Sequence, residues 1–305
     1  MRAASFDSGV GQDRTHICGY ERTLYPEANC PLSVNLIVTN RCNYRCLFCF
    51  GRLKSFGGII DDSRILDIPG LLYEAGCRKI TFEGGEPFLH PEISRLVEVA
   101  KDAGLTTGIV TNGSLVTYPR LARMSSTLDW LGLSVDSAKE EIELRLGRGN
   151  GGHVAHARKV ADWTHELGIG LKVNAVITRL NCREDMREFA TSLRPKRFKA
   201  LQVLKIAGEN DDSYDALSIS RRDFDSFVKR HLDLNAAGIQ FVSEREEDMI
   251  GSYVMMTPNG RFISNSKGFY RIGAKNVFRH GVRASFEEAE WDIGKFLKRG
   301  GYYAW

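Results

Sequence analysis

The stretch Ser33-Val-Asn-Leu-Ile-Val-Thr-Asn-Arg-Cys-Asn-Tyr-Arg-Cys-Leu-Phe-Cys-Phe50 decides how the rest of the sequence is interpreted. Its first part is rich in β-branched residues, which predicts a strand over 33–39. Cys42, Cys46 and Cys49 follow in a C-x3-C-x2-C spacing. Three thiolates in so short a loop can wrap one metal centre, and three ligands on a [4Fe–4S] cube leave one iron open to bind a small molecule. A cluster used only for electron transfer normally takes four protein ligands.

A structural zinc site is the alternative interpretation of the same cysteines. Such a site closes with four ligands, usually from two C-x2-C pairs or from one pair and two histidines. The sequence contains one C-x2-C, so a fourth ligand would come from a distant histidine or from Cys18, Cys30, Cys77 or Cys182. The spacing favours the cluster, and metal analysis of the protein separates the two interpretations.

Length and composition limit the class of protein. The 305 residues suit one large domain or a domain with an appendage, and 43% hydrophobic with 26% charged residues is ordinary for a globular protein. Seven cysteines without an even ladder of spacings argue against a disulfide scaffold. A net charge of +4 does not suggest a protein that coats nucleic acid. We expect no signal peptide, because residues 1–12 lack an apolar core, and no membrane span.

Strand and helix patterns alternate along most of the chain. Right-handed βαβ units of this kind build a parallel sheet, either doubly wound or curled towards a barrel, with the active site at the carboxyl ends of the strands. A polar stretch at 211–215 marks a boundary, after which we expect a helix over 221–235, a hairpin around 257–260 and a helix ending at 298–301. The expected strands are 33–39, 79–83, 105–111, 130–136, 169–177 and 198–206, and the expected helices between them are 61–76 (interrupted by Pro69), 91–104 and 154–168.

Polar residues follow several of these strands at one edge of the expected sheet. The second strand ends in Glu83-Gly-Gly-Glu-Pro87, the third in Thr111-Asn-Gly-Ser114 and the fourth in Ser134-Val-Asp136. Glycines after a strand let exposed backbone approach a ligand closely. Each segment alone could be an ordinary loop, but their agreement favours a site for a nucleoside-like cofactor.

Basic residues recur inside the strands with a spacing of two. Lys172 and Asn174 share one face of the fifth strand, and Arg197 and Lys199 share one face of the sixth. Lys79 adds a further cation on the second strand. Buried cations without partners are costly, so the pattern suggests a polyanionic ligand such as a triphosphate. The Arg197 guanidinium could donate hydrogen bonds to two of its oxygens at once. The spacing fixes a shared face but leaves open whether that face points inward or into water.

Taken together, the motifs resemble the viperin family of radical S-adenosylmethionine enzymes from about residue 33 to the end of the sequence. The first three motifs occur in many radical S-adenosylmethionine enzymes, and the later ones are particular to viperins. In chain order they are Cys42-x3-Cys46-x2-Cys49, Phe82 to Phe88, Thr111 to Ser114, Ser134-x-Asp-Ser137, Gly147-Arg-Gly149, Lys172-x-Asn174, Arg197-x-Lys199, Gly208-Glu-Asn210, Ser252-Tyr253 and Lys298-Arg-Gly-Gly301.

The resemblance implies an α/β fold, namely a partial (β/α)6 radical S-adenosylmethionine barrel. An N-terminal arm (1–32) would precede the barrel (33–210), and a C-terminal extension (211–305) would close the substrate site. The implied activity is dehydration of a ribonucleoside triphosphate to its 3′-deoxy-3′,4′-didehydro form, an antiviral RNA chain terminator. CTP is the first expected substrate, with UTP close behind and GTP a further candidate.

The resemblance also implies roles for residues at matching positions. The cysteines Cys42, Cys46 and Cys49 would bind the [4Fe–4S] cluster, and Tyr253 would act near the ribose, although a packed core tyrosine is an equal alternative. S-adenosylmethionine would be held by Phe48, Gly84, Gly85, Glu86, Asn112 and Ser134. The nucleotide would be held by Asn35, Lys79, Arg148, Lys172, Asn174, Arg197 and Lys199.

The sequence departs from the vertebrate viperins at a few points. Glu83 stands where they have a serine, which puts local contacts and nucleotide choice in doubt. The glycine loop after Arg148 is shorter, and their amphipathic N-terminal membrane helix is missing. We therefore expect a cytoplasmic, soluble monomer that binds neither membrane nor nucleic acid and takes electrons from a donor such as flavodoxin or ferredoxin.

Two rival functions remain at this point. Another radical S-adenosylmethionine enzyme could act on a peptide or a cofactor precursor, but such enzymes often carry further cysteine clusters, and no cysteine follows Cys182. A non-catalytic, zinc-bound nucleotide sensor is the second rival. In the implied reaction, reductive cleavage of S-adenosylmethionine gives a 5′-deoxyadenosyl radical, which removes hydrogen from the ribose 4′ carbon before the 3′ hydroxyl leaves as water.

Overall fold

A computed structural model describes residues 30–54 and 63–303 of the chain. Its centre is a ten-stranded sheet in the order β10-β9-β8-β1-β2-β3-β4-β5-β6-β7. Strands β1 to β7 are parallel to their neighbours, and β8 to β10 continue the sheet beyond β1. The strands are β1 Ser33–Thr39, β2 Lys79–Gly84, β3 Thr106–Thr111, β4 Trp130–Ser134, β5 Gly170–Ile177, β6 Arg197–Gln202, β7 Gln240–Glu244, β8 Met255–Met256, β9 Phe262–Ser264 and β10 Arg271–Ile272.

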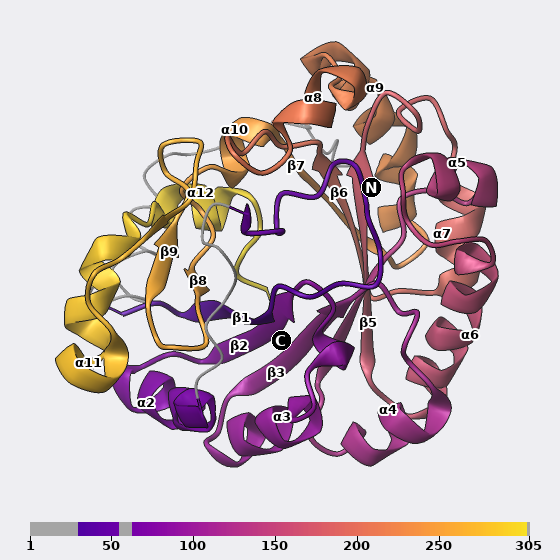
Figure 1. Cartoon of the computed structure of the whole chain (residues 1–305). Helices are drawn as coiled ribbons and strands as arrows, with labels where there is room; N and C mark the ends of the chain where they lie inside the picture. The colour runs from indigo at the N-terminus through magenta and orange to yellow at the C-terminus, as the bar shows by residue number, and fades with distance from the viewer. Residues whose placement is uncertain (1–29, 55–62, 304–305) are drawn as a thin grey trace, which may run out of the picture.

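The sheet curves, and the main helices lie along its outer side, as Figure 1 shows. This is the open α/β sheet of a partial barrel, the architecture that the motifs predict. The helices are α2 Ile68–Ala75, α3 Ile93–Asp102, α4 Tyr118–Met124, α5 Glu140–Arg145, α6 His153–Glu166, α7 Arg187–Leu193, α8 Asp211–Leu217, α9 Arg221–His231, α10 Glu246–Met249, α11 Val277–Phe286 and α12 Ile293–Lys298, with short 3-10 turns at Ser63–Asp67, Pro87–Leu89, Leu232–Asn235 and Glu287–Ala289.

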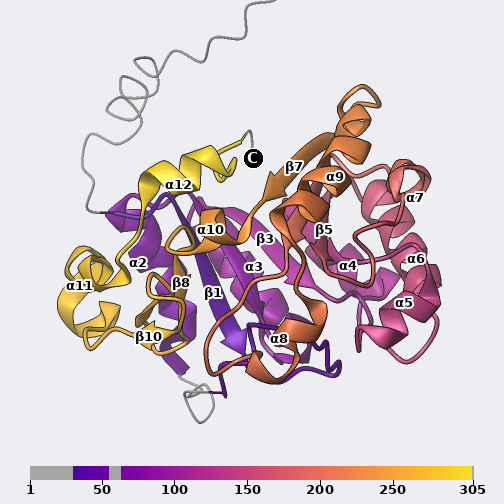
Figure 2. The ribbon, with the colours of Figure 1, turned by 90° about the horizontal axis from the view of Figure 1, so that it is seen from above.

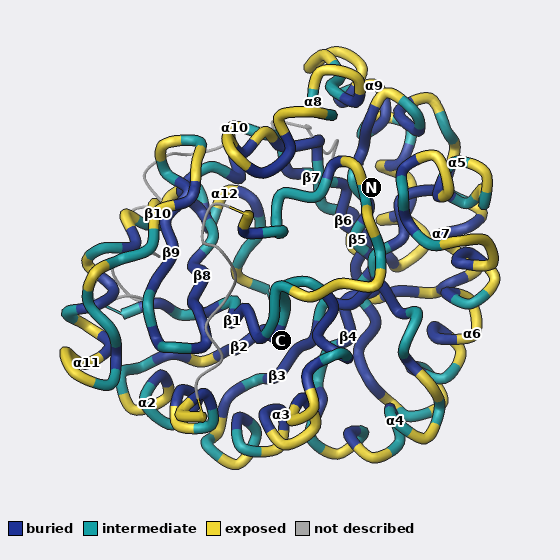
Figure 3. Tube along the Cα trace, in the orientation of Figure 1, coloured by how far each residue is buried: buried dark blue, intermediate teal, exposed yellow. Residues whose placement is uncertain are grey.

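Alternation along the strands separates two environments. Apolar side chains on one face pack against the helices and form the main core, in which Leu36, Phe82, Leu131, Val173 and Phe198 are fully buried or nearly so. The intervening residues point to the inner side of the sheet. Figure 3 shows that most strand residues are buried and that exposed residues lie on the outer turns of the helices. The polar strand residues therefore face inward, away from the helix layer.

Most of the predicted elements are confirmed, with shifted ends. The sixth strand stops at Gln202 instead of continuing to 206, because residues 203–206 leave the sheet without regular structure, with Lys205 exposed. The helix expected over 61–76 is a 3-10 turn followed by α2, with Pro69 in its first turn, where the missing N–H costs nothing. Residues 61–62 and almost all of the expected arm at 1–32 lie outside the described residues.

The chain beyond residue 210 adds strands to both edges of the sheet. Strand β7 pairs with β6 at one edge, and β8 pairs with β1 at the other. In Figure 2, α12 lies across the end of the sheet opposite the arrowhead of β1, so it covers the amino ends of the strands. The C-terminal part thus widens the barrel and covers one of its ends.

Among the described residues, no helix is both long and apolar enough to cross a membrane.

Candidate active site

The inner face of the sheet borders one large cavity. The cavity itself measures about 280 Å³, and it opens to solvent at its mouth. All but one of the predicted site residues line it, namely Asn35, Cys42, Cys46, Phe48, Cys49, Lys79, Gly84, Gly85, Asn112, Ser134, Arg148, Lys172, Asn174, Arg197, Lys199 and Tyr253.

The cysteine loop forms the mouth of the cavity at the carboxyl end of β1. Cys42, Cys46 and Cys49 are free thiols that line the same cavity. Burial raises the pKa of Cys46 to about 12, so this thiol stays protonated unless a bound cation stabilises the thiolate. A cubane cluster binds each thiolate through a different iron, so its ligands surround a space and need not meet at one point. The three thiols around one cavity mouth fit such a group.

Two glycines hold the cysteine loop from opposite sides. A Cβ on Gly85 would lie 2.0 Å from the carbonyl oxygen of Arg41, and a Cβ on Gly147 would lie 2.4 Å from that of Arg45. Gly147 also has φ +75°, a conformation that other residues rarely adopt. The Arg45 N–H donates to the Gly147 carbonyl at 3.2 Å. Close backbone contact on both sides thus fixes the path of the loop that carries the three thiols.

Glu86 is the predicted site residue that does not line the cavity. Its carboxylate is fully buried and accepts hydrogen bonds from the Thr111 hydroxyl at 2.7 Å, the Asn112 N–H at 2.8 Å and the Phe88 N–H at 3.0 Å. These bonds tie the end of β2 to the end of β3. Glu86 therefore fixes the position of Asn112, which does line the cavity.

The strand-borne cations point inward, which resolves the question that the sequence left open. Lys79, Arg197 and Lys199 are buried and line the cavity together with Lys172. In the strand register, Lys172 lies beside Arg197, and Asn174 lies beside Lys199. Burial lowers the pKa of Lys79 to about 6, that of Lys199 to about 7 and that of Lys172 to about 8, because a buried ammonium loses its hydration. An anionic ligand would reverse these shifts.

A buried carboxylate, Glu244 at the end of β7, connects several of these groups. It lies 2.5 Å from the Lys199 ammonium and accepts a hydrogen bond from Arg299 at 3.1 Å. The Tyr253 hydroxyl donates to it at 2.5 Å and accepts from Lys199 at 3.0 Å. Burial alone would raise the pKa of Glu244, but Lys199 and Arg299 lower it to about 2. Burial and Glu244 together raise the pKa of Tyr253 well above its usual value, so Tyr253 keeps its proton.

The segment after α12 covers the cationic end of the cavity. Arg197 donates to the Gly300 carbonyl at 2.5 Å, and its guanidinium lies 4.0 Å from the centre of the Tyr303 ring. The Tyr303 hydroxyl contacts the Lys79 ammonium. Sequence reasoning missed Glu244, Arg299 and Tyr303 as residues of the site. Lys298-Arg-Gly-Gly301 is a signal that could have pointed to Arg299, whereas Glu244 has no local signal.

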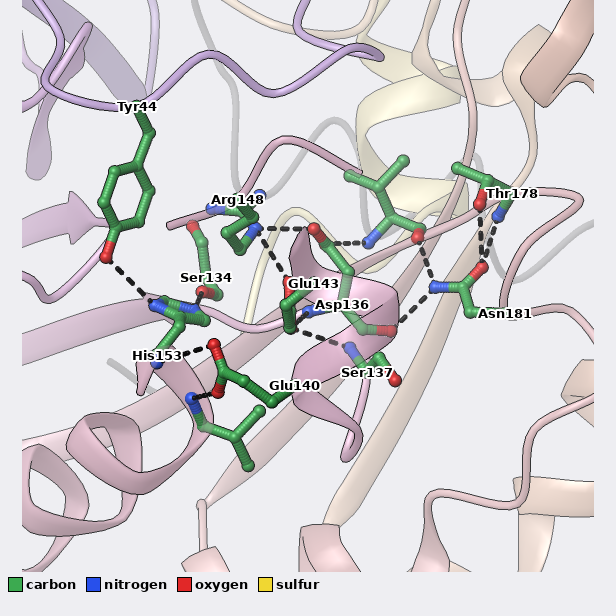
Figure 4. A network of polar contacts seen from close by, with 12 residues as sticks. Tyr44, Ser134, Asp136, Ser137, Glu140, Glu143, Arg148, His153, Thr178 and Asn181 are labelled. Carbon is green, nitrogen blue, oxygen red and sulfur yellow. Dashed lines mark hydrogen bonds and ion pairs between the residues drawn. The ribbon is translucent and has the colours of Figure 1, made fainter. Parts of the chain in front are cut away.

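A polar network around Arg148 holds its guanidinium at the mouth of the cavity, as Figure 4 shows. Arg148 Nε donates to Asp136 at 2.5 Å and lies 3.6 Å from Glu143. Glu143 in turn accepts the backbone N–H groups of Asp136 and Ser137 at 2.8 and 2.9 Å. Burial, with Asp136 next to it, raises the pKa of Glu143 to about 8. The carboxyl pair fixes Arg148 by its Nε edge and leaves the other end of the guanidinium towards the cavity.

Two amide side chains complete the lining. The Asn35 amide on β1 donates to the Glu83 carboxylate on β2 at 2.9 Å. The Asn174 side-chain oxygen on β5 is buried and has no hydrogen-bond partner. An unpaired buried acceptor costs about 1–3 kcal/mol, so a donor from a ligand would satisfy it.

Within residues 30–54 and 63–303, no three His, Cys, Asp or Glu side chains converge closely enough to hold one metal ion.

Known proteins are similar to this chain in both sequence and fold. The profile of the radical SAM superfamily matches residues 36–193. An S-adenosylmethionine-dependent nucleotide dehydratase of Flammeovirga pacifica is 37% identical over 282 residues, which cover 90% of this chain and 96% of that protein. A protein of the same name from Lacinutrix mariniflava is 35% identical over 283 residues, and this chain spans only 58% of its length.

The solved structures agree at the level of the fold. Streptococcus suis SuiB bound to S-adenosylmethionine superimposes with a TM-score of 0.61, covering 82% of this chain and 63% of SuiB. The sequence identity is 18%, so this similarity concerns the fold alone.

Proposed function

We propose that this chain removes water from the ribose of a ribonucleoside triphosphate. The proposal starts from its family, because the chain belongs to the radical SAM superfamily and, within it, to the S-adenosylmethionine-dependent nucleotide dehydratases. The resemblance predicted from the motifs is thereby confirmed for the family and for this kind of enzyme. The proposed product is the 3′-deoxy-3′,4′-didehydro nucleotide. CTP is the first proposed substrate, UTP follows closely, and GTP is a further candidate.

One observation carries the proposal, namely the order of groups along the cavity. The three cysteines lie at the mouth, at the carboxyl ends of the strands, and the buried cations lie towards the amino ends. Along β2 this order is Lys79, then Thr81 and Glu83, then Gly84. A nucleoside triphosphate has its polyanion at one end and its sugar next to it. Such a ligand would place its phosphates among the cations and its sugar towards the cysteines.

The residues at the mouth fit the two cofactors of the family. We assign Cys42, Cys46 and Cys49 to the [4Fe–4S] cluster. Phe48, Gly84, Gly85, Asn112 and Ser134 would hold S-adenosylmethionine, and Glu86 would act through Asn112. When bound, the two groups supply a radical that removes hydrogen from the sugar.

The residues of the deeper part would hold and orient the nucleotide. Lys79, Lys172, Arg197 and Lys199 would bind the triphosphate by charged hydrogen bonds. The orphaned oxygen of Asn174 would accept a hydrogen bond from the ligand. Asn35, and Arg148 nearer the mouth, would border the sugar and the base. Because a misaligned radical attacks the wrong bond, this positioning is the main task of the protein.

Tyr253 is the proposed catalytic residue on the ribose side. Its hydroxyl lies between the Lys199 ammonium and the Glu244 carboxylate, at 3.0 and 2.5 Å. A hydroxyl that donates to a carboxylate and accepts from an ammonium belongs to a proton chain. Loss of the 3′ hydroxyl as water requires one proton, which this chain would deliver.

Further properties of the family complete the proposal. The product would end viral RNA synthesis when a polymerase incorporates it. A small redox protein such as flavodoxin or ferredoxin would supply the electrons. We propose a cytoplasmic monomer that binds neither nucleic acid nor membrane.

The direct test is to incubate the reduced, cluster-containing enzyme with S-adenosylmethionine and each of the four ribonucleoside triphosphates. We expect consumption of one pyrimidine nucleotide, CTP before UTP, with 5′-deoxyadenosine formed in equal amount. Formation of 5′-deoxyadenosine with peptides but with no nucleotide would favour a peptide-modifying enzyme. Zinc without iron or sulfide in anaerobically purified protein would favour a nucleotide sensor.

A further inference from the structure

Glu83 occupies a distinct position between the two halves of the cavity. It is the last side chain of β2 before Gly84, and it faces the cavity together with Thr81 and Lys79, two and four residues earlier on the same strand. Gly84 and Gly85 follow it directly at the mouth. The carboxylate thus lies where the cationic end gives way to the end that carries the cysteines.

The carboxylate is held on one side and open on the other. The Asn35 amide donates to Glu83 Oε2 at 2.9 Å. Among the described residues, this is the only hydrogen bond to the Glu83 side chain that the structure shows, and no ammonium or guanidinium lies within ion-pair distance of it. Asn35 therefore fixes the orientation of the carboxylate of this cavity-lining residue, and Oε1 has no hydrogen-bond partner among the described residues.

The surrounding charges restrict what can lie against Glu83. Lys172, Lys199 and Arg299 are the cations that act on it electrostatically, while Glu244 has already engaged two of them, Lys199 and Arg299. A phosphate group placed against a carboxylate would be repelled, so the triphosphate belongs deeper, next to Lys79 and Arg197. The neighbouring part of a nucleotide is the sugar, which offers neutral hydroxyl donors.

We propose that Glu83 accepts a hydrogen bond from the 2′ hydroxyl of the ribose and so selects ribonucleotides against 2′-deoxyribonucleotides. The 3′ hydroxyl leaves in the reaction, so the 2′ hydroxyl is the donor that stays throughout. Dinucleotide-binding folds use a carboxylate in the same way to recognise the ribose 2′ hydroxyl. This inference rests on the proposed nucleotide substrate and names the residue that recognises its sugar.

The test compares ribo- and 2′-deoxyribonucleotides by binding. The cluster-containing protein is kept without reductant, so that no turnover occurs, and Kd is measured calorimetrically for CTP, UTP and GTP and for their 2′-deoxy forms. A hydrogen bond to a charged group gives a preference of about ten- to hundredfold for the ribonucleotide. In Glu83→Ala this ratio falls to about one, and the 2′-deoxynucleotide binds as tightly as before or more tightly, because an anion has been removed.

Three further variants make the result specific. Glu83→Gln keeps the shape of the side chain and loses its charge, so the preference for the ribonucleotide over the 2′-deoxyribonucleotide falls several-fold. This variant provides the test if the alanine variant does not fold. Asn35→Ala frees the carboxylate to rotate and lowers the ratio by a smaller factor. Glu166→Gln removes a carboxylate from the exposed outer side of α6, where it pairs with Tyr118, and leaves the ratio unchanged.

The outcomes separate this inference from the proposed function. If the ribonucleotide preference survives in Glu83→Ala and Glu83→Gln, the assignment of Glu83 is wrong, and the nucleotide dehydratase proposal stands. If these variants change the preference among bases and not that between sugars, Glu83 contacts the base, and the assignment is again overturned. If the unaltered protein binds no nucleoside triphosphate, both proposals fall.

Discussion

The two ends of the cavity are built in different ways. The mouth is formed by short segments that directly follow strands β1 to β4, and backbone contacts at Gly85 and Gly147 hold it in shape. The cationic end is assembled from single side chains on β2, β5, β6 and β7 and is covered by residues after α12. The mouth depends on local backbone geometry, whereas the cationic end depends on long-range pairing of strands and on balanced buried charge.

This difference separates two tasks. A radical cofactor needs a fixed cradle, which close-packed backbone provides. A charged substrate binds best to cations that have already lost their hydration, and the buried ammonium groups with lowered pKa values provide them. Changes at the mouth should therefore abolish chemistry, and changes at the cationic end should weaken substrate binding while leaving cofactor binding intact.

The largest effect is expected from Cys46→Ala, at the mouth. Loss of one of three thiolates should abolish iron retention and release of 5′-deoxyadenosine. Iron and sulfide analysis after anaerobic reconstitution, together with chromatography of the reaction mixture, measures both. Cys182→Ala, a buried cysteine outside the cavity, is the matched control and should keep its iron. Turnover by the Cys46 variant would end the assignment of the cluster.

The next effect is expected from Lys199→Ala, at the cationic end. Each lost charged hydrogen bond costs about 1.5–3 kcal/mol, which corresponds to roughly ten- to hundredfold in KM for the triphosphate. The affinity for S-adenosylmethionine should stay within about twofold. Steady-state kinetics and equilibrium binding measure the two quantities separately. Lys229→Ala, in the last turn of α9, serves as the control for losing one lysine. An unchanged KM would mean that Lys199 serves another anion or only holds Glu244.

A smaller effect, confined to the mouth, is expected from Gly147→Ala. The added Cβ meets the Arg45 carbonyl, and the residue must keep φ +75°, so the loop has to move. Strain of this kind costs of the order of 1–3 kcal/mol. We expect faster loss of iron on exposure to a chelator and unchanged triphosphate affinity. Gly238→Ala, with a similar φ of +78° and no nearby atoms, controls for backbone strain alone.

The smallest effect is a pH dependence that acts on the cationic end alone. In the protein without nucleotide, Lys79 and Lys199 have pKa values lowered to about 6 and about 7, and a triphosphate binds their protonated forms. Affinity should therefore fall several-fold as pH rises from 7 to 9, with proton uptake on binding in calorimetry at pH 8. At these two lysines the unfolded chain binds more protons than the folded one over this range, so their contribution to the stability of the folded protein should rise with pH. A triphosphate affinity that does not change between pH 7 and pH 9 would contradict the lowered pKa values of Lys79 and Lys199.

Sequence alone predicts the two ends to different degrees, for the same physical reason. Cys42-x3-Cys46-x2-Cys49, Gly84-Gly85 and the strand pattern are local, so spacing reveals them. The shared face of Lys172 and Asn174 is also visible, but its inward direction depends on how the sheet curves. Glu244 comes from a strand that pairs only after β6, and no motif marks it. The motif around Glu86 does not reveal that its carboxylate accepts hydrogen bonds from Thr111 and two backbone N–H groups.

The segment after α12, which covers the amino ends of the strands, is among the last parts of the chain to be synthesised. Tyr303 is 101 residues further along the chain than Gln202, the last residue of β6. At about 5–20 residues per second, the ribosome reaches Tyr303 roughly 5–20 s after it completes β6. Until then, Lys79 and Arg197 lack their contacts with Tyr303 and Gly300. The thiol-bearing loop is thus synthesised well before the residues that cover the amino ends of the strands.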